Sequence, residues 1–382
     1  MLFIVHQLNF GGVQKAALSA LNAIDYGQYD VTLYVRKNRT ELLDGVNKNV
    51  SRVIVNDDKT NYYRKPFAVL LYFLIKLCGF IKADASRYEN RLKEYVIRKG
   101  MEYEKKHCLP AERFDTAVSY IQGYTALFTA EYVEADKKVM LYHGSVDESH
   151  DIHEKAFPAF TKLVAVNDGC REVLCGLYPE FADKFCSVEN YVDETAVRER
   201  SAEGCAIEKR GLTLCTCGRL TPVKGFDTAV EAAKILKERG IDFIWYFVGG
   251  GPEKGSLEKL IEKYYLENNV IITGMLDNPY PYIAACDIYV QSSREEAHPL
   301  SVIEAQILCR PVVSTMTVGG KCLVEDEKNG LLAGFSASSL ADNIMRIAGS
   351  PELSEKMRNA LAAVDYGAKK EKYIRECNNI LC

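Results

Sequence analysis

Cysteine and histidine patterns that mark metal or disulfide proteins are missing from this chain of 382 residues. It has 13 cysteines but no CxxC pair, and its 6 histidines show no regular spacing with them. Neither a zinc site nor a disulfide framework is therefore indicated. Scattered, unpaired cysteines fit a reducing compartment, and we expect the protein in the cytoplasm.

Long apolar runs are also missing. No stretch reaches the roughly 20 apolar residues that span a bilayer. The opening Met-Leu-Phe-Ile-Val lacks a basic lead and is short, so it predicts a first strand rather than a signal peptide. The net charge of -4 gives no support for a nucleic-acid partner. Short repeats and low-complexity tracts are absent as well.

The glycine turns do not have the spacing of a dinucleotide site. Three glycines follow Val248, but they do not form GxGxxG, and no acidic residue ends the next predicted strand. A nicotinamide cofactor is therefore not indicated. Such a turn still lets a ligand approach the backbone closely.

Apolar runs and helical periodicity alternate along both halves of the chain. This pattern predicts an α/β protein with parallel sheets covered by helices. In the first half we expect strands at 2–5, 31–35, 53–55, 116–120, 138–142 and 163–166. In the second half we expect strands at 212–217, 243–248, 270–273, 287–291 and 311–314. Helices are predicted at 13–24, 226–239, 256–265, 299–308, 338–349 and 352–363.

The length and the two alternations predict two Rossmann-like, doubly wound domains that face a cleft. We place the first at 1–195 and the second at 196–364, and we interpret the charged stretch 194–210 as the linker. A C-terminal helix at 365–382 is expected to pack back on the first domain. Ligands of such folds bind at the carboxyl ends of the strands.

The segment 59–106 differs from the rest of the chain in charge. It holds twelve Lys or Arg against five Asp or Glu, a local excess of seven positive charges (12 − 5 = 7). Within it, an apolar helix is predicted at 66–82, too short to span a membrane. Two interpretations stay open: an interfacial helix on an anionic membrane, or a buried helix of the first domain.

Two carboxylates mark the strand–loop–helix at 287–308. Glu296 falls in the loop and Glu304 about a turn and a half inside the helix, with Pro299 as the predicted first helical residue. Carboxylates accept hydrogen bonds from sugar hydroxyls, and a helix N-terminus favours an anion. The combination indicates a nucleotide sugar, although the spacing alone is weak.

A second loop supplies the cations. The segment Gly-Arg-Leu-Thr-Pro-Val-Lys-Gly at 218–225 follows a predicted strand and precedes a helix. It places Arg219 and Lys224 at the expected cleft, where they could neutralise a diphosphate.

These motifs, in this order, resemble a retaining glycosyltransferase of family 4, of the bacterial surface-polysaccharide type, which has the two-domain GT-B fold. The likeness covers most of 1–364 and is strongest over 212–335. Its matching pieces are the glutamate pair, Gly-Gly-Val-Gln at 11–14, the loop at 218–225, Val-Gly-Gly-Gly-Pro at 248–252, Ile-Thr-Gly at 272–274, and the segments 317–325 and 329–332. His298 departs from the aromatic or small residue of many relatives, and Gln14 replaces a common glutamate.

The resemblance implies roles for the donor-binding residues. Arg219 and Lys224 would hold the diphosphate and stabilise the departing charge, and Glu304 would accept hydrogen bonds from the ribose hydroxyls. Glu296 would bind hydroxyls of the transferred sugar. The remaining donor contacts would come from the backbone and neighbouring side chains of Gly12, Gly250, Gly274, Ala297, His298, Pro299 and Leu300.

His143, in Tyr-His-Gly after a predicted strand, matches a family histidine near the reacting carbon. The resemblance makes it a catalytic or substrate-contacting residue, together with Glu296, Arg219 and Lys224. A packed core histidine is the alternative interpretation. Asp57 and Asp58 lie far from every motif, so no metal-binding Asp-x-Asp loop is indicated.

The implied activity is that of a metal-independent, retaining hexosyltransferase without a cofactor. Its donor would be a nucleoside-diphosphate sugar, expected to be UDP-linked, and its acceptor a hydroxyl of a glycan or lipid-linked molecule. Peripheral contact at the inner face of the plasma membrane through 59–106 would suit a lipid-linked acceptor. Two alternatives stay open: a non-catalytic glycosyltransferase-like partner subunit, and a nucleotide-sugar 2-epimerase on the same fold.

Overall fold

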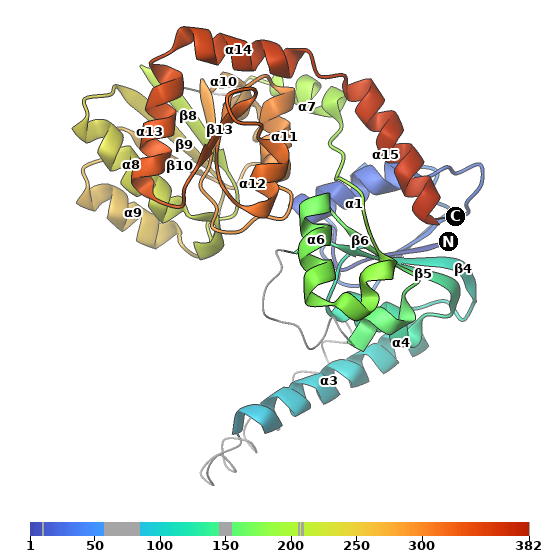
Figure 1. Cartoon of the computed structure of the whole chain (residues 1–382). Coiled ribbons are helices and arrows are strands. Elements are labelled where there is room, and N and C mark those ends of the chain that lie inside the picture. The colour runs from blue at the N-terminus through green and yellow to red at the C-terminus, as the bar shows by residue number, and fades with distance from the viewer. Residues whose placement is uncertain (10, 57–84, 145–154, 205–206, 208–209, 382) are drawn as a thin grey trace.

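Two parallel β-sheets organise the chain (Figure 1). The computed structural model describes residues 1–9, 11–56, 85–144, 155–204, 207 and 210–381. The first sheet consists of β1 (Leu2–Val5), β2 (Thr32–Val35), β3 (Arg52–Val55), β4 (Phe114–Ser119), β5 (Ala135–Tyr142), β6 (Lys162–Ala165) and β7 (Phe185–Ser187). The second consists of β8 (Leu212–Cys217), β9 (Phe243–Val248), β10 (Val270–Gly274), β11 (Ile288–Gln291), β12 (Val312–Thr315) and β13 (Gly330–Ala333).

Both sheets have a doubly wound strand order. The orders are β3-β2-β1-β4-β5-β6-β7 and β10-β9-β8-β11-β12-β13. All of these neighbours pair in parallel. The order reverses between β1 and β4 in the first sheet and between β8 and β11 in the second. Ligands of open α/β sheets bind at such switch points, beyond the carboxyl ends of the strands. The predicted fold class is confirmed.

Helices cover both faces of the first sheet. One face packs against α3 (Ala85–His107), α4 (Tyr124–Tyr132) and α6 (Asp168–Leu177). The other packs against α1 (Gly12–Ala23) and the C-terminal α15 (Tyr366–Leu381), which lies against α1. The rings of Tyr191 and Tyr373 stack at 5.5 Å between centroids and add to this contact. In Figure 1, α15 returns to the first sheet and brings the two termini close together.

The second sheet is covered in the same way. One face packs against α8 (Phe226–Glu238), α9 (Lys254–Lys263) and α13 (Ala337–Ala348). The other packs against α10 (Tyr280–Ala285) and α11 (Leu300–Ile307). The other α-helices of the described residues are α7 (Glu194–Ser201), α12 (Val318–Leu323) and α14 (Pro351–Ala362). The predicted domain limits, 195/196 and 364/365, stay a prediction.

Strand β9 shows why this sequence forms a central strand. All six of its residues are buried, as expected for a parallel strand with helices on both faces. Trp245 packs in the core on the α8 side, whereas Tyr246 packs on the α10 side. The Trp245 indole donates to Thr216 Oγ1 at 3.0 Å, so its one polar atom is satisfied. Burying a large apolar side chain of this kind stabilises the fold by roughly 1.5–3 kcal/mol.

The two sheets share part of their core. One continuous apolar cluster joins the α1 face of the first sheet to the α10–α11 face of the second. Leu300 at the start of α11 lies 3.9 Å from where a Cβ on Gly12 would be. The N-termini of α1 and α11 therefore meet where the two sheets adjoin.

Several elements differ from the sequence-based expectation. The charged stretch interpreted as a linker contains α7, which the Asp193 side chain caps by accepting from the Ala196 amide at 3.2 Å. Pro299 is the N-cap of α11 rather than its first residue. The long helix α3 and the short elements β7, β13, α4, α6, α10 and α12 were not predicted.

Some sequence-based predictions cannot be placed on the structure. The apolar helix at 66–82, most of the basic segment 59–106, and Asp57 and Asp58 lie outside the described residues. Within the described part of the chain, no helix is long and apolar enough to cross a membrane.

A buried ion pair fixes α3 to the first sheet. The Arg36 guanidinium donates to both oxygens of Glu104 at 2.8 Å, and the two side chains are only 6% and 5% exposed. The Tyr34 hydroxyl also donates to Glu104, at 3.0 Å. Removing one partner of a buried pair leaves an uncompensated charge.

Arg36→Met should therefore lower the free energy of unfolding by about 3–5 kcal/mol, because it leaves the buried Glu104 carboxyl group without its cationic partner. The matched control is Arg52→Met, whose pair with Glu112 is 46% and 44% exposed. It should cost about 1 kcal/mol or less. Urea unfolding followed by circular dichroism measures both. Equal losses would contradict the special cost assigned to the buried pair.

Candidate functional site

Two glycine turns meet at the carboxyl end of the second sheet. The amides of Gly218 and Leu220, after β8, donate to the carbonyls of Val248, the last residue of β9, and of Gly250, each at 3.0 Å. Gly249 has φ 155°, and a Cβ there would lie 1.8 Å from the Gly218 carbonyl oxygen, so only glycine allows the contact.

The third predicted glycine joins the same edge. Gly274, at the end of β10, forms an isolated bridge with Gly249. A Cβ on Gly250 would meet Met275 at an ordinary 3.5 Å. The structure thus brings Gly250 and Gly274 together beside the loop that carries Arg219.

The two predicted cations differ in their surroundings. The Arg219 side chain is exposed and makes no side-chain hydrogen bond or ion pair within the described residues. Lys224 instead donates to Glu296 Oε1 in a close ion pair. Its ammonium has three N–H groups, so this bond leaves two for another acceptor. Gly225, with φ 63°, lets this loop pack against the Ser292 carbonyl after β11.

Glu296 uses one carboxylate oxygen for the protein. Besides Lys224, Oε1 accepts from Gln291 Nε2 at 2.9 Å and from Ser293 Oγ at 3.0 Å. Oε2 accepts no hydrogen bond from the described residues and is not among their buried, unpaired atoms. The carboxylate is therefore fixed through one oxygen and open to solvent through the other.

Glu304 repeats this arrangement, with a partner from the opposite sheet. Its side chain is 4% exposed, and Oε1 accepts from Lys15 Nζ at 2.8 Å and from Tyr280 OH at 3.1 Å. Lys15 lies on α1 and Tyr280 on α10. Oε2 again has no donor within the described residues, and it keeps a small accessible area although the residue as a whole is buried.

The loop between the two glutamates is held by the first sheet. The Asn167 side chain donates to the Ala297 carbonyl at 2.6 Å, and its oxygen caps α6 by accepting from the Cys170 amide at 2.7 Å. The amides of Ala297, His298 and Leu300 have no acceptor among the described residues. They lie at the positive end of α11, so this end of the helix suits an anion.

Two histidines, His298 buried and His143 half-buried, lie near one another at this site. His298 is 8% exposed, and neither of its ring nitrogens has a partner in the described chain. His143 follows β5; its amide donates to Gln122 Oε1 at 3.1 Å and its ring lies 4.7 Å from the Tyr120 ring. Its Nε2 is also buried and unpaired.

Both imidazoles are neutral at pH 7. Burial, with a smaller contribution from His298, lowers the pKa of His143 to about 3. Burial and, to a lesser extent, Lys369 lower the pKa of His298 to about 4. A neutral imidazole has one N–H donor and one acceptor nitrogen, which suits a hydroxyl ligand.

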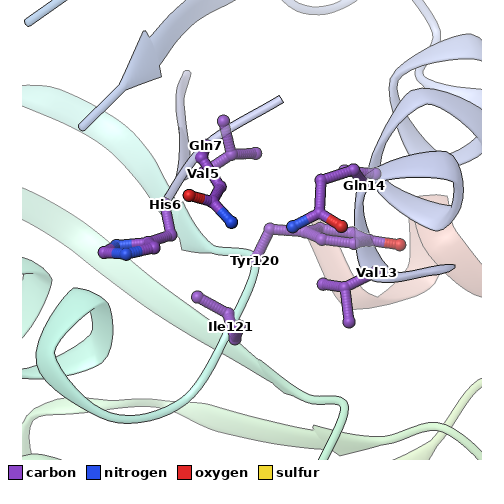
Figure 2. Close-up of a pocket in the computed structure, with 8 residues that line it drawn as sticks. Val5, His6, Gln7, Val13, Gln14, Tyr120 and Ile121 are labelled. Carbon is purple, nitrogen blue, oxygen red and sulfur yellow. The ribbon is translucent and has the colours of Figure 1, made fainter. Parts of the chain in front are cut away.

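A small pocket opens at the switch point of the first sheet (Figure 2). Its lining comes from the end of β1, the start of α1 and the end of β4. In Figure 2 the amides of Gln7 and Gln14 point toward each other over Tyr120, whereas the His6 ring points away. Amides beside an aromatic ring offer hydrogen bonds and an apolar surface.

Sequence reasoning missed the partners of the two glutamates. Gln291 and Ser293 lie within five residues of Glu296 and could have been found from their position at the end of β11 and just after it. Lys15 directly follows the Gly-Gly-Val-Gln motif, which is a weaker signal. Tyr280 had no signal. Among the residues that the structure places, no group of three His, Cys, Asp or Glu could hold a metal ion.

Comparison with known proteins adds an independent result. Residues 197–363 match the family model described as glycosyl transferases group 1. An uncharacterized glycosyltransferase of Haemophilus influenzae is 30% identical over 388 residues, which cover 99% of this chain and 98% of the relative.

Other similarities are partial or structural. The alpha-D-kanosaminyltransferase of Streptomyces kanamyceticus is 30% identical over 179 residues, or 46% of this chain. The match spans 45% of that relative, less than half of its length. The crystal structure of Anabaena HepE in complex with UDP and glucose superposes with a TM-score of 0.69 at 15% identity, over 99% of this chain and 98% of HepE. That likeness concerns the fold alone.

The two neutral histidines predict how stability depends on pH. In the unfolded chain both histidines bind a proton once the pH falls below their ordinary pKa of 6.5. In the folded chain His298 binds its proton only near pH 4 and His143 only near pH 3. The free energy of unfolding should fall with falling pH, by up to about 1.4 kcal/mol per pH unit for each histidine.

His298→Leu should make this decline less steep between pH 7 and pH 5, as measured by urea unfolding. The comparison uses the slope, so a constant packing difference between Leu and His cancels. An unchanged slope would contradict a buried, neutral His298.

Proposed function

The chain belongs to the glycosyl transferases group 1 family, and we propose that it moves a hexose from a nucleoside-diphosphate sugar to a hydroxyl of a glycan or lipid-linked acceptor. One observation carries the proposal. Glu296 and Glu304 each keep one carboxylate oxygen that accepts no hydrogen bond from the described residues, and the exposed Arg219 has no partner among them either. The proposed site thus combines acceptors for sugar hydroxyls with a cation for phosphate.

The diphosphate would lie between Arg219, Lys224 and the N-terminus of α11. As the bond from the sugar carbon to the diphosphate oxygen breaks, negative charge grows on that phosphate. The two cations and the free amides near His298 would stabilise it in place. These groups supply positive charge from the protein itself, which supports the proposal of a metal-independent transfer.

The second carboxylate oxygens of Glu304 and Glu296 would each bind a different part of the donor. Glu304 Oε2 would accept from the ribose hydroxyls and Glu296 Oε2 from hydroxyls of the transferred sugar. Gly250 and Gly274 would lie beside the nucleoside because they share an edge with Arg219. HepE binds UDP, and its shared fold supports a UDP-linked donor for this chain.

The acceptor would enter from the first sheet. His143 and the pocket over Tyr120 lie at the carboxyl ends of its strands (Figure 2). For retention of configuration, the acceptor oxygen attacks on the face that the leaving diphosphate vacates. Its proton passes to the departing phosphate oxygen, so no separate base is needed. The neutral imidazoles of His143 and His298 would position hydroxyls by hydrogen bonding.

Arg219→Ala should lower kcat/KM for the sugar donor by about 100-fold or more, because it removes a preorganised cation from the leaving group. Release of UDP from UDP-sugars, with and without acceptor, measures the effect. The matched control is Arg239→Ala, which removes the same charge at the other end of α8, roughly 20 Å along the helix. Arg239 pairs with Asp342 at 2.6 Å, away from the cleft.

The same assay separates the alternatives. Equal activity of the Arg219 and Arg239 variants would contradict the proposed diphosphate site. If the unmodified protein turns over no common donor, a non-catalytic partner subunit is favoured. Inversion at C2 of the donor sugar without release of the nucleotide would favour an epimerase.

We further propose peripheral contact with the inner face of the plasma membrane through 59–106. The excess of seven positive charges in this segment supports attraction to anionic lipid. Its described end, α3, leads away from the body of the first sheet (Figure 1). A lipid-linked acceptor would then reach the cleft from the side of the first sheet.

Flotation with anionic vesicles tests this contact. The unmodified protein should float with phosphatidylglycerol vesicles and stay behind with neutral phosphatidylcholine. Replacing Arg64, Lys65, Lys76 and Lys82 by Gln should abolish flotation, because roughly 1 kcal/mol of attraction is lost per basic residue. The matched control replaces four exposed lysines of α8 and α9, namely Lys237, Lys254, Lys259 and Lys263. Equal flotation of both variants would argue against a membrane role for the segment.

A further inference from the structure

Lys15 lies on α1 of the first sheet, but its side chain contacts two helices of the second sheet. Its ammonium donates to Glu304 Oε1 at 2.8 Å and to the Tyr280 hydroxyl at 3.1 Å, and lies 4.9 Å from the centre of the Tyr280 ring. Tyr280 in turn donates to the same carboxylate oxygen. Lys15 from α1, Tyr280 from α10 and Glu304 from α11 thus form a closed triangle of hydrogen bonds. Helix α1 covers the first sheet, and α10 and α11 cover the second.

We propose that Lys15 is a positioning residue for the nucleotide, which fixes Glu304 across the cleft so that its second oxygen meets the donor ribose. This inference rests on the proposed function, because it assigns the open oxygen of Glu304 to the nucleoside. It adds a residue of the first sheet to a donor site that is otherwise built on the second.

The electrostatics of Glu304 explain why it needs this partner. The carboxylate is 4% exposed, and leaving such a charge without a cation is costly. Within the described residues, Lys15 is the one cation paired with it. Burial on its own would lower the pKa of Lys15, but Glu304 and then Tyr280 outweigh it and raise the pKa. The Lys15 side chain is therefore protonated and positively charged at neutral pH.

The geometry explains how the partner orients the carboxylate. Lys15 and Tyr280 both bond Oε1, so the plane of the carboxylate is set and Oε2 is directed elsewhere. Glu296 has the same hydrogen-bond pattern, because Lys224, Gln291 and Ser293 all donate to its Oε1. An oriented acceptor loses less entropy when it binds a hydroxyl than a freely rotating one.

Titration calorimetry with UDP as the ligand tests the inference. Lys15→Met should weaken UDP binding about tenfold, which is about 1.4 kcal/mol, whereas Lys15→Arg should restore most of the affinity because it keeps the charge. The decisive comparison uses Glu304→Gln. In that background Lys15→Met should change the affinity less than about twofold, because no carboxylate is left to position.

The matched control is Lys48→Met, which removes the same charge from an exposed position of the first half of the chain. It should leave UDP binding unchanged. Thermal melting of each variant shows whether it is folded, and Lys15→Arg keeps the test valid if Lys15→Met melts early.

Two results would overturn the inference alone, and a third would overturn the proposed function as well. Unchanged UDP binding by Lys15→Met contradicts it. An equal loss with and without the Glu304 carboxylate would mean that Lys15 contacts UDP directly rather than acting through Glu304. Failure of the unmodified protein to bind any nucleoside diphosphate would instead remove the proposed function, and this inference with it.

Discussion

A carboxylate that is withdrawn from water needs a charged or hydrogen-bonding partner, and the loop before α11 and α11 itself each carry one such carboxylate, Glu296 and Glu304. Glu304 is almost fully buried and Glu296 partly so. Each is neutralised by one lysine, and the two lysines come from different sheets: Lys224 from the second and Lys15 from the first. This requirement links the strand ends, the glycine turns and the two halves of the chain into one site.

The pairing also refines the expected role of Lys224. A cation that only held phosphate would be free before the donor binds, as Arg219 is. Lys224 instead shares its charge with Glu296, so a donor would meet a pair that is nearly neutral. Its two remaining N–H groups keep it available for phosphate. Arg219 therefore carries most of the attraction for the diphosphate, and Lys224 connects the phosphate end of the site to the sugar end.

The sequence predicted both sheets and every motif loop, because strand periodicity, glycine turns and charged loops are local patterns. The structure then brought Gly250, Gly274, Arg219 and Glu296 to one edge, as parallel strands require. Short elements such as β7 and α10 were missed, since three to six residues show too little periodicity. Helix α7 was not predicted because it lies in the charged stretch after residue 193 and its start depends on the Asp193 cap. The Lys15–Glu304 contact joins residues 289 positions apart, which no local pattern encodes.

The central claim is that Glu296, in the loop before α11, and Glu304, in α11, each offer one carboxylate oxygen to the donor. A crystal structure of the protein with UDP and the transferred sugar tests it most directly. We predict the ribose hydroxyls on Glu304 Oε2, the sugar hydroxyls on Glu296 Oε2 and the diphosphate against Arg219, with Lys15 still bonded to Glu304. Ribose bound away from Glu304, or a diphosphate that does not touch Arg219, would contradict the account.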